Sequence, residues 1–116
     1  MTAFEELLVW QRARVLTRDV YRLVRGSGIA QDYAFRDQIQ RAVLSIAANI
    51  AEGAERGQPR EFSYFLRVAK ASAGELRSHL ILACDLELCP ATAAERLQDE
   101  LAQIGRMLGA LIQRLV

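Results

Sequence analysis

The sequence predicts an all-α protein, an antiparallel up-down-up-down four-helix bundle that forms a single domain over residues 1–116. First, 52% of the 116 residues are apolar, and there are only two prolines. Second, apolar residues recur at helical spacing in four segments separated by glycine or proline. Third, no segment shows the alternation of a β-strand, and a chain of this length is large enough to bury one core without staples.

The first two helices are expected to lie on either side of Gly26-Ser27-Gly28, because glycine ends helices. A capping box formed by Thr2 and Glu5 is expected to open the first helix. The second helix is expected to start after Asp32 and to end near Arg56-Gly57. The core positions of the first helix are Phe4, Leu8, Val9, Ala13, Leu16, Val20, Leu23 and Val24, and those of the second are Phe35, Ile39, Ala42, Val43, Ile46 and Ile50.

The third helix is expected to open at Pro59, a favoured first helical position, and to end at Cys89-Pro90. The fourth helix is expected to open with a second capping box, Thr92 with Glu95. Both helices carry apolar seams that alternate steps of four and three, as left-handed bundles require. The seams are Phe62, Leu66, Ala69, Ala73, Leu76, Leu80 and Ala83, and then Leu97, Leu101, Ile104, Leu108, Leu111 and Leu115.

Residues 45–53, SIAANIAEG, place polar residues inside an apolar helix. At ~100° per residue, Ile46, Ile50 and Gly53 share the core stripe, and Gly53 lets a neighbouring backbone approach closely. Asn49, Glu52 and Arg56 form an adjoining polar row, in which Glu52 can pair with Arg56 and Asn49 with Glu52 or a neighbouring helix end. A phosphate-binding loop would need a preceding strand and clustered glycines. We therefore interpret the row as structural.

Three segments cover nearly the whole chain: VWQRARVLTRDVY, QIQRAVLSIAANIAEGAERG and EFSYFLRVAKASAGELRSHL. Together they resemble, in order, a family of four-helix-bundle proteins whose founding members are encoded in intervening sequences of bacterial 23S rRNA genes. NIAEG followed by FSYFL and GEL is a fairly specific part of this resemblance. The chain departs from the family pattern in SIAANIAEG, where a proline or a bulkier residue often precedes the asparagine. It also departs at Gln40, where a second arginine is common.

The resemblance implies an oligomer that contacts nucleic acid, and it suggests no catalysis. Members of the family resemble the accessory variability protein of diversity-generating retroelements. That relative forms a pentameric barrel and is understood to bind nucleic acid and a reverse transcriptase. By similarity, we expect a homo-oligomer, with a pentamer favoured, and RNA or DNA as a partner. The missing arginine at Gln40 weakens any basic surface at that position.

Two rows of basic residues are the candidate nucleic-acid-binding residues. Because the net charge is only +1, any attraction for nucleic acid must come from local patterns. Arginines at i, i+4 and i+8 stand ~6 Å apart along a helix, close to the spacing of successive phosphates. A ring would repeat the first row in every subunit. The first row is Arg14, Arg18, Arg22 and Arg25, with Asp19 expected on another face, and the second is Arg67, Lys70 and Arg77.

The alternative interpretation of these rows is a solvated face with ion pairs to other helices. The protein would then be a protein–protein interaction scaffold that binds no nucleic acid. Small-residue surfaces fit either interpretation. They comprise Gly105-x-x-x-Gly109, which indicates a tight helix crossing or a flat patch, the run AKASAG at 69–74, and Leu44, Ala47, Ala48 and Ala51.

Enzyme activity is not expected, and neither a cofactor nor a metal site is expected. His79, Cys84 and Cys89 follow one another at steps of five, each of which turns a helix by ~140°, so they cannot converge on one metal. The same spacing within a helix separates the two cysteines by more than ~7 Å and excludes a disulfide. We expect neither a signal peptide nor a membrane span. Free thiols in such a chain predict a cytoplasmic location.

Overall fold

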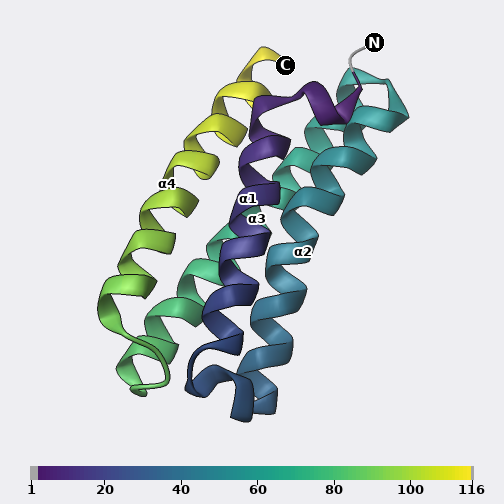
Figure 1. Ribbon diagram of the computed structural model, residues 1–116. Coiled ribbons are helices and arrows are strands. Elements are labelled where there is room, and N and C mark those ends of the chain that lie inside the picture. The colour runs from purple at the N-terminus through teal and green to yellow at the C-terminus, as the bar shows by residue number, and fades with distance from the viewer. Residues whose placement is uncertain (1–2, 116) are drawn as a thin grey trace.

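The computed structural model describes residues 3–115 and shows four long helices side by side (Figure 1). In chain order they are α1 (Leu8–Arg25), α2 (Tyr33–Arg56), α3 (Pro59–Asp85) and α4 (Ala91–Arg114), with short 3₁₀ helices at Phe4–Glu6 and Gly28–Gln31. Helix α1 packs on α2 and α4, and α3 packs on the same two helices, so α1 and α3 lie diagonally. The bundle measures 43 × 20 × 19 Å. The predicted all-α four-helix bundle is confirmed.

Two helices begin where the sequence predicts. Asp32 precedes α2, and its carboxylate accepts a hydrogen bond from the backbone N–H of Phe35 at 3.2 Å. Such a side-chain acceptor satisfies one of the four unpaired N–H groups at a helix start. Pro59 is the first residue of α3, where its missing N–H costs nothing.

One predicted capping box includes a residue outside the described part of the chain, and the structure contradicts the other. Thr2 lies outside the described residues, and α1 itself starts only at Leu8, after the 3₁₀ turn that contains Phe4 and Glu5. The box of Thr92 and Glu95 is wrong, because α4 begins two residues earlier than this box requires. Pro90 is the residue before the helix, and its carbonyl accepts the backbone N–H of Ala94 at 3.1 Å.

A residue with a left-handed backbone follows the end of α2 and another follows the end of α3, but only the first is a glycine. Gly57 ends α2 with φ 75°, as predicted, whereas α3 ends at Asp85 and not at the predicted Cys89-Pro90. There the N–H of Leu88 donates to the carbonyl of Ala83 at 2.9 Å, and the N–H of Glu87 donates to that of Cys84 at 3.0 Å. This double hydrogen bond is a Schellman motif, and Glu87 takes its left-handed position with φ 59°.

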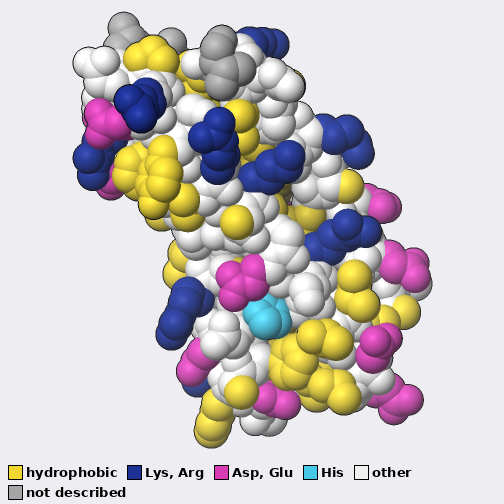
Figure 2. Space-filling view, turned by 180° about the vertical axis from the view of Figure 1, so that it is seen from behind, with side chains coloured by type: hydrophobic (Ala, Val, Ile, Leu, Met, Phe, Trp, Pro, Cys, Tyr) yellow, Lys and Arg dark blue, Asp and Glu magenta, His cyan; other side chains and the backbone are white. Residues whose placement is uncertain are grey.

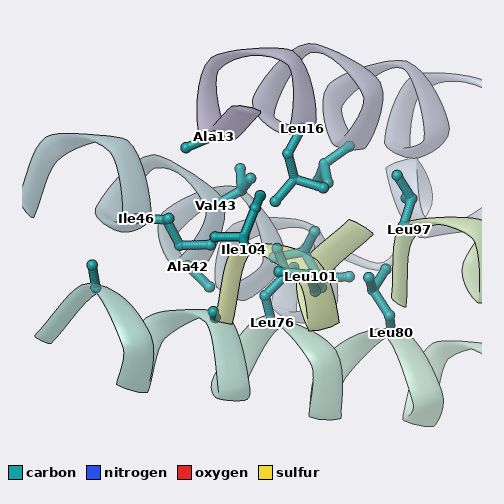
Figure 3. Close-up of a cluster of buried hydrophobic side chains, with 14 of the residues drawn as sticks. Ala13, Leu16, Ala42, Val43, Ile46, Leu76, Leu80, Leu97, Leu101 and Ile104 are labelled. Atoms are coloured by element: carbon teal, nitrogen blue, oxygen red, sulfur yellow. The ribbon is translucent and has the colours of Figure 1, made fainter. Parts of the chain in front are cut away.

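The core contains most of the predicted apolar positions, and side chains from all four helices meet in it (Figure 3). The α3 seam is buried except for half-buried Phe62, and the α4 seam is buried from Leu97 to Leu108. The prediction for Leu8 is wrong: it is 61% exposed, because its neighbour Val9 takes the core position. Ile29 is fully buried although it lies in a connecting segment, which helical periodicity alone did not reveal.

None of the helices within residues 3–115 combines the length and the apolar character needed to cross a bilayer.

The glycines of Gly105-x-x-x-Gly109 do not make a tight helix crossing. A Cβ placed at Gly105 would meet no atom within 4 Å, and one at Gly109 would meet the ammonium nitrogen of Lys70 at 3.5 Å. Of the two alternatives for this motif, only the flat surface patch is left.

Candidate nucleic-acid interface

The outward face of α1 carries the first predicted basic row. The buried residues of this helix are Val9, Ala13, Leu16, Val20 and Val24. At ~100° per residue the four arginines fall on the opposite side of the helix, and all four are exposed: Arg14, Arg18, Arg22 and Arg25. The fold therefore holds this row together and directs it toward solvent.

Local contacts restrain three of these arginines without neutralising the row. The guanidinium of Arg14 lies 5.7 Å from the ring centre of Trp10, and that of Arg25 lies 5.8 Å from the ring centre of Tyr21. Such cation–π contacts orient a guanidinium but leave its charge in place. The Nε atom of Arg18 lies 3.5 Å from a carboxylate oxygen of Asp19. Asp19 occupies another position around the helix, but its side chain reaches back to Arg18, and an exposed pair of this kind is weak.

A hollow of about 310 Å³ between α1 and α4 adds a basic residue to this surface. Arg22 lines the hollow from α1 and Arg96 lines it from α4, together with Asp19 and three apolar residues. Arg96 was not predicted from the sequence, because no pattern within α4 relates it to α1. Only the packing of the two helices places these guanidinium-bearing residues around one hollow.

The second row lies on a different side of the molecule. Arg67, Lys70 and Arg77 are all exposed on α3, which lies diagonally to α1. The view from behind shows basic side chains spread over the upper half of that side and a hydrophobic cluster below (Figure 2). A single nucleic-acid strand on one face of one subunit would therefore contact one row and not both.

The predicted structural polar row is present with the expected Glu52–Arg56 pair, but Asn49 has a different partner from the one expected. Asn49 donates its amide to the carbonyl and hydroxyl oxygens of Ser45, at 2.8 and 2.9 Å, and not to Glu52. The Glu52–Arg56 pair is present at 2.9 Å, and Arg56 also contacts Glu61 at 3.2 Å. The hydrogen bonds from Arg56 to Glu52 and then to Glu61 raise the pKa of Arg56 above its ordinary value. The row thus joins α2 to the first turn of α3.

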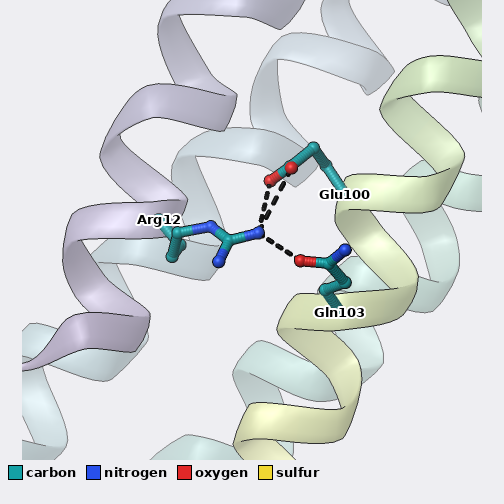
Figure 4. A network of polar contacts seen from close by, with 3 residues as sticks. All are labelled: Arg12, Glu100 and Gln103. Carbon is teal, nitrogen blue, oxygen red and sulfur yellow. Dashed lines mark hydrogen bonds and ion pairs between the residues drawn. The ribbon is translucent and has the colours of Figure 1, made fainter.

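Arg12, in contrast, is removed from the basic surface by contacts with α4 (Figure 4). Its guanidinium donates to both carboxylate oxygens of Glu100, at 3.1 and 3.2 Å, and to the amide oxygen of Gln103. This cluster was not predicted from the sequence, because Arg12 and Glu100 are 88 positions apart. Arg12 therefore joins two helices and is no part of the nucleic-acid-binding candidate.

The cysteines and the histidine lie on α3 and in the turn that follows it. Cys84 and Cys89 are free, although Cys89 lies in the turn after α3 and not in a helix as assumed. Burial first, and the nearby Cys84 second, raise the pKa of the Cys89 thiol. The ring of His79 meets the ring of Phe35 edge-on, and its Nε2 lies 3.5 Å from a carboxylate oxygen of Glu75. Over residues 3–115, no group of three or more metal-ligating side chains could hold an ion.

Comparison with known proteins places this geometry in a family. The model of the 23S rRNA-intervening sequence protein family matches residues 5–110. A crystal structure of a protein of unknown function from the S23 ribosomal protein family of Bacteroides thetaiotaomicron VPI-5482 is similar, with a TM-score of 0.82. The two chains share 21% sequence identity, and the similarity covers 90% of this chain and 98% of the other, which supports the fold. No curated protein matches.

Proposed function

The chain belongs to the 23S rRNA-intervening sequence protein family, and from this premise we propose that it is a non-enzymatic, self-associating protein of the cytoplasm that binds nucleic acid. Its ligand is the sugar–phosphate backbone of RNA or DNA, bound without base specificity. The binding surface is the arginine row on the outward face of α1. The assembly is a closed ring of identical subunits, with a pentamer as the favoured size.

The observation that carries this proposal is the exposure of Arg14, Arg18, Arg22 and Arg25 on one face of one helix. Among the ion pairs of the described residues, only the weak contact to Asp19 involves this row. Lysine and arginine side chains that neutralise phosphates release counterions, which is the main source of sequence-independent affinity. Four such side chains along α1 are modest for one chain, but a ring would multiply them.

Exposed apolar side chains support self-association. Leu44 on α2 is 50% exposed and lies on the same face as Ala48, which is exposed as well. Apolar surface of this kind is commonly covered in an oligomer. Light scattering should therefore return a multiple of the 13.0 kDa chain mass, with five chains favoured. A mass of 13.0 kDa at micromolar concentration would contradict the ring.

The test of nucleic-acid binding is fluorescence anisotropy with labelled RNA and DNA oligonucleotides at two salt concentrations. The native protein should bind, with log K falling by roughly 0.7 to 0.9 per phosphate neutralised for each decade of salt. The triple variant Arg14→Glu/Arg18→Glu/Arg22→Glu should lose most of this affinity for double-stranded oligonucleotides. A matched control changes the net charge equally on other exposed surfaces: Arg41→Glu/Arg106→Glu/Arg114→Glu.

The control triple variant should keep most of the affinity of the native protein. Equal losses in the two triple variants would mean that only net charge matters, and the assignment to α1 would be wrong. An absence of binding by the native protein at low salt would refute the function itself.

The competing function is a protein–protein interaction scaffold, and one observation favours it. Ile81, Leu82 and Leu86 are exposed near the end of α3. Ile81 and Leu82 line a shallow hollow of about 380 Å³. If the native protein binds no nucleic acid, this apolar end of α3 becomes the better candidate for the functional surface.

A further inference from the structure

Tyr64 is an exposed aromatic side chain whose ring is not covered by a cation. Among residues 3–115, the two exposed tyrosines are Tyr33 and Tyr64, at 67% and 60%. The guanidinium of Arg36 lies 4.6 Å from the ring centre of Tyr33. Trp10, Tyr21 and Phe65 also carry an arginine on their rings, whereas no arginine or lysine lies over Tyr64. The ring of Tyr64 is therefore available for stacking with a ligand.

The neighbourhood of Tyr64 holds the ring in place. The ring of Tyr64 meets the ring of Phe65 edge-on, with the ring centres 5.1 Å apart and an interplanar angle of 83°. Arg56 stacks on Phe65 at 5.2 Å and is itself fixed by Glu52 and Glu61. Contacts of this kind reduce the number of orientations that the exposed tyrosine can take, which lowers the entropic cost of binding.

Tyr64 also lies beside a hollow that has basic walls. The hollow measures about 340 Å³ and is lined by Arg56, Arg60, Glu61, Tyr64 and Phe65. Glu61 is engaged by Arg56, while Arg60 is exposed and forms no ion pair with the described residues. The hollow therefore combines an aromatic face, apolar surface and a guanidinium that is free to bind an anion.

Basic residues flank Tyr64 on both sides along α3. Arg60 precedes it by four residues and Arg67 follows it by three, so the three side chains share one face of the helix. Seven residues at ~1.5 Å place Arg60 and Arg67 about 10 Å apart along the axis. Lys70 continues the strip toward α4. In Figure 2 hydrophobic side chains lie between basic ones over the upper part of this side.

We infer that this strip is a binding site for single-stranded nucleic acid, in which an unpaired base stacks on Tyr64 while Arg60 and Arg67 bind the flanking phosphates. Base–aromatic stacking combined with a positively charged track is the usual chemistry of single-strand binding. A base inside a duplex cannot reach the tyrosine ring, because both of its faces are already stacked. The inference rests on the proposed nucleic-acid binding, but it assigns a surface diagonal to α1 and a class of ligand, the unpaired strand.

The test compares labelled 20-nucleotide oligo(dT), 20-nucleotide oligo(U) and a 20-base-pair DNA duplex by fluorescence anisotropy. Tyr64→Ala should weaken binding to both single strands by roughly 5-fold to 100-fold, as expected for the loss of one stacked base. Duplex binding should not change. The salt slope of single-strand binding should not change either, because no phosphate contact is lost, whereas Arg60→Ala/Arg67→Ala should lower that slope by about one to two.

Two further variants serve as controls. Tyr64→Phe retains the ring and should bind single strands like the native protein. Tyr33→Ala removes an equally exposed tyrosine whose ring is already covered by Arg36, and it should have little effect. Equal losses for Tyr33→Ala and Tyr64→Ala, or a loss for Tyr64→Phe as large as for Tyr64→Ala, would overturn the stacking site.

The outcomes also separate this inference from the proposed function. If the native protein binds and Tyr64→Ala binds both single strands equally well, the stacking site is wrong and the α1 row stands. If the native protein binds nothing at low salt, both fail. A changed light-scattering mass for Tyr64→Ala would identify Tyr64 as a subunit contact and would likewise overturn the site.

Discussion

The α2–α3 and α1–α4 interfaces join neighbouring helices in different ways. Between α2 and α3, small residues let the helices approach: Gly53 is buried, and a Cβ there would lie 2.9 Å from the Cβ of Phe65. Between α1 and α4, the long side chains of Arg12, Glu100 and Gln103 span the gap. An interface in which two helices approach closely has little room to adjust, whereas one bridged by long side chains can relax.

The polar contacts across the two interfaces also differ in how far they are buried. Ser45 and Ser72 hydrogen-bond across the α2–α3 interface with their oxygens 2.8 Å apart, and Ser72 is buried. The Arg12–Glu100 pair on the α1–α4 side is about one-third exposed, at 32% and 37%. Water competes with an exposed ion pair and weakens it, and it competes less with the hydroxyl of Ser72, which is buried. We therefore expect substitutions at α2–α3 to cost more stability than substitutions at α1–α4.

The largest effect is expected from Gly53→Ala. The added methyl group would lie 2.9 Å from both Phe62 and Phe65, which forces the two helices apart. Overpacking typically costs about 1 to 3 kcal/mol, and the better helix propensity of alanine returns about 1 kcal/mol, which leaves a net loss of about 0 to 2 kcal/mol. The Cβ of Phe65 cannot rotate away from the added methyl group, so we expect the upper half of this range, a loss of about 1 to 2 kcal/mol. Urea unfolding at fixed protein concentration measures this change.

Gly74→Ala is the matched control for Gly53→Ala. Gly74 also lies inside a helix, α3, but a Cβ there would meet no atom within 4 Å. This variant should gain about 1 kcal/mol from helix propensity alone. The two substitutions should therefore have opposite signs, and a stabilised Gly53→Ala protein would show that the α2–α3 interface is not closely packed.

A smaller loss is expected from Ser72→Ala, which removes the hydrogen bond to Ser45. A hydrogen bond of this kind contributes about 0.5 to 1.5 kcal/mol to the free energy of unfolding. Ser63→Ala sharpens the comparison, because the hydroxyl of Ser63 is buried on α3 without a hydrogen-bond partner. Thermal unfolding should show Ser72→Ala destabilised and Ser63→Ala unchanged or slightly stabilised. Equal losses would mean that the Ser45–Ser72 hydrogen bond contributes nothing specific.

A still smaller loss is expected from Arg12→Ala. The pair with Glu100 is partly exposed, so its loss should cost about 0.5 to 1 kcal/mol, and less at high salt. Arg18→Ala removes a pair within one helix, to Asp19, and should cost less than about 0.5 kcal/mol. If urea unfolding shows that Arg12→Ala costs more than Gly53→Ala, the order of the two interfaces is the reverse of the one proposed.

Local sequence signals predicted the helix boundaries well wherever the physical cause was itself local. Asp32 hydrogen-bonds an N–H three residues away, Pro59 fixes its own backbone, and Gly57 adopts a left-handed conformation that few other residues tolerate. The end of α3 was predicted four residues too late. There a glutamate, Glu87, takes the left-handed position, and nothing in its residue type indicates this.

Some features of the candidate site were also predicted from the sequence, and others were not. Periodicity placed Arg14, Arg18, Arg22 and Arg25 on one face of α1, because a helix has a fixed rotation per residue. Periodicity did not predict that Arg12 turns toward Glu100, that Arg96 joins Arg22 around a hollow, or that the ring of Tyr64 is left uncovered.

By itself, the sequence determined the four helices, their core seams and the basic rows, because each depends on contacts within a few residues or on a fixed helical period. Only the tertiary structure decided which helices are diagonal, which arginines pair with an acid on another helix, and which aromatic ring faces solvent. Those properties depend on side chains that are tens of residues apart in the chain. The packing of one helix against another brings them together, and no pattern within a single helix specifies that partner.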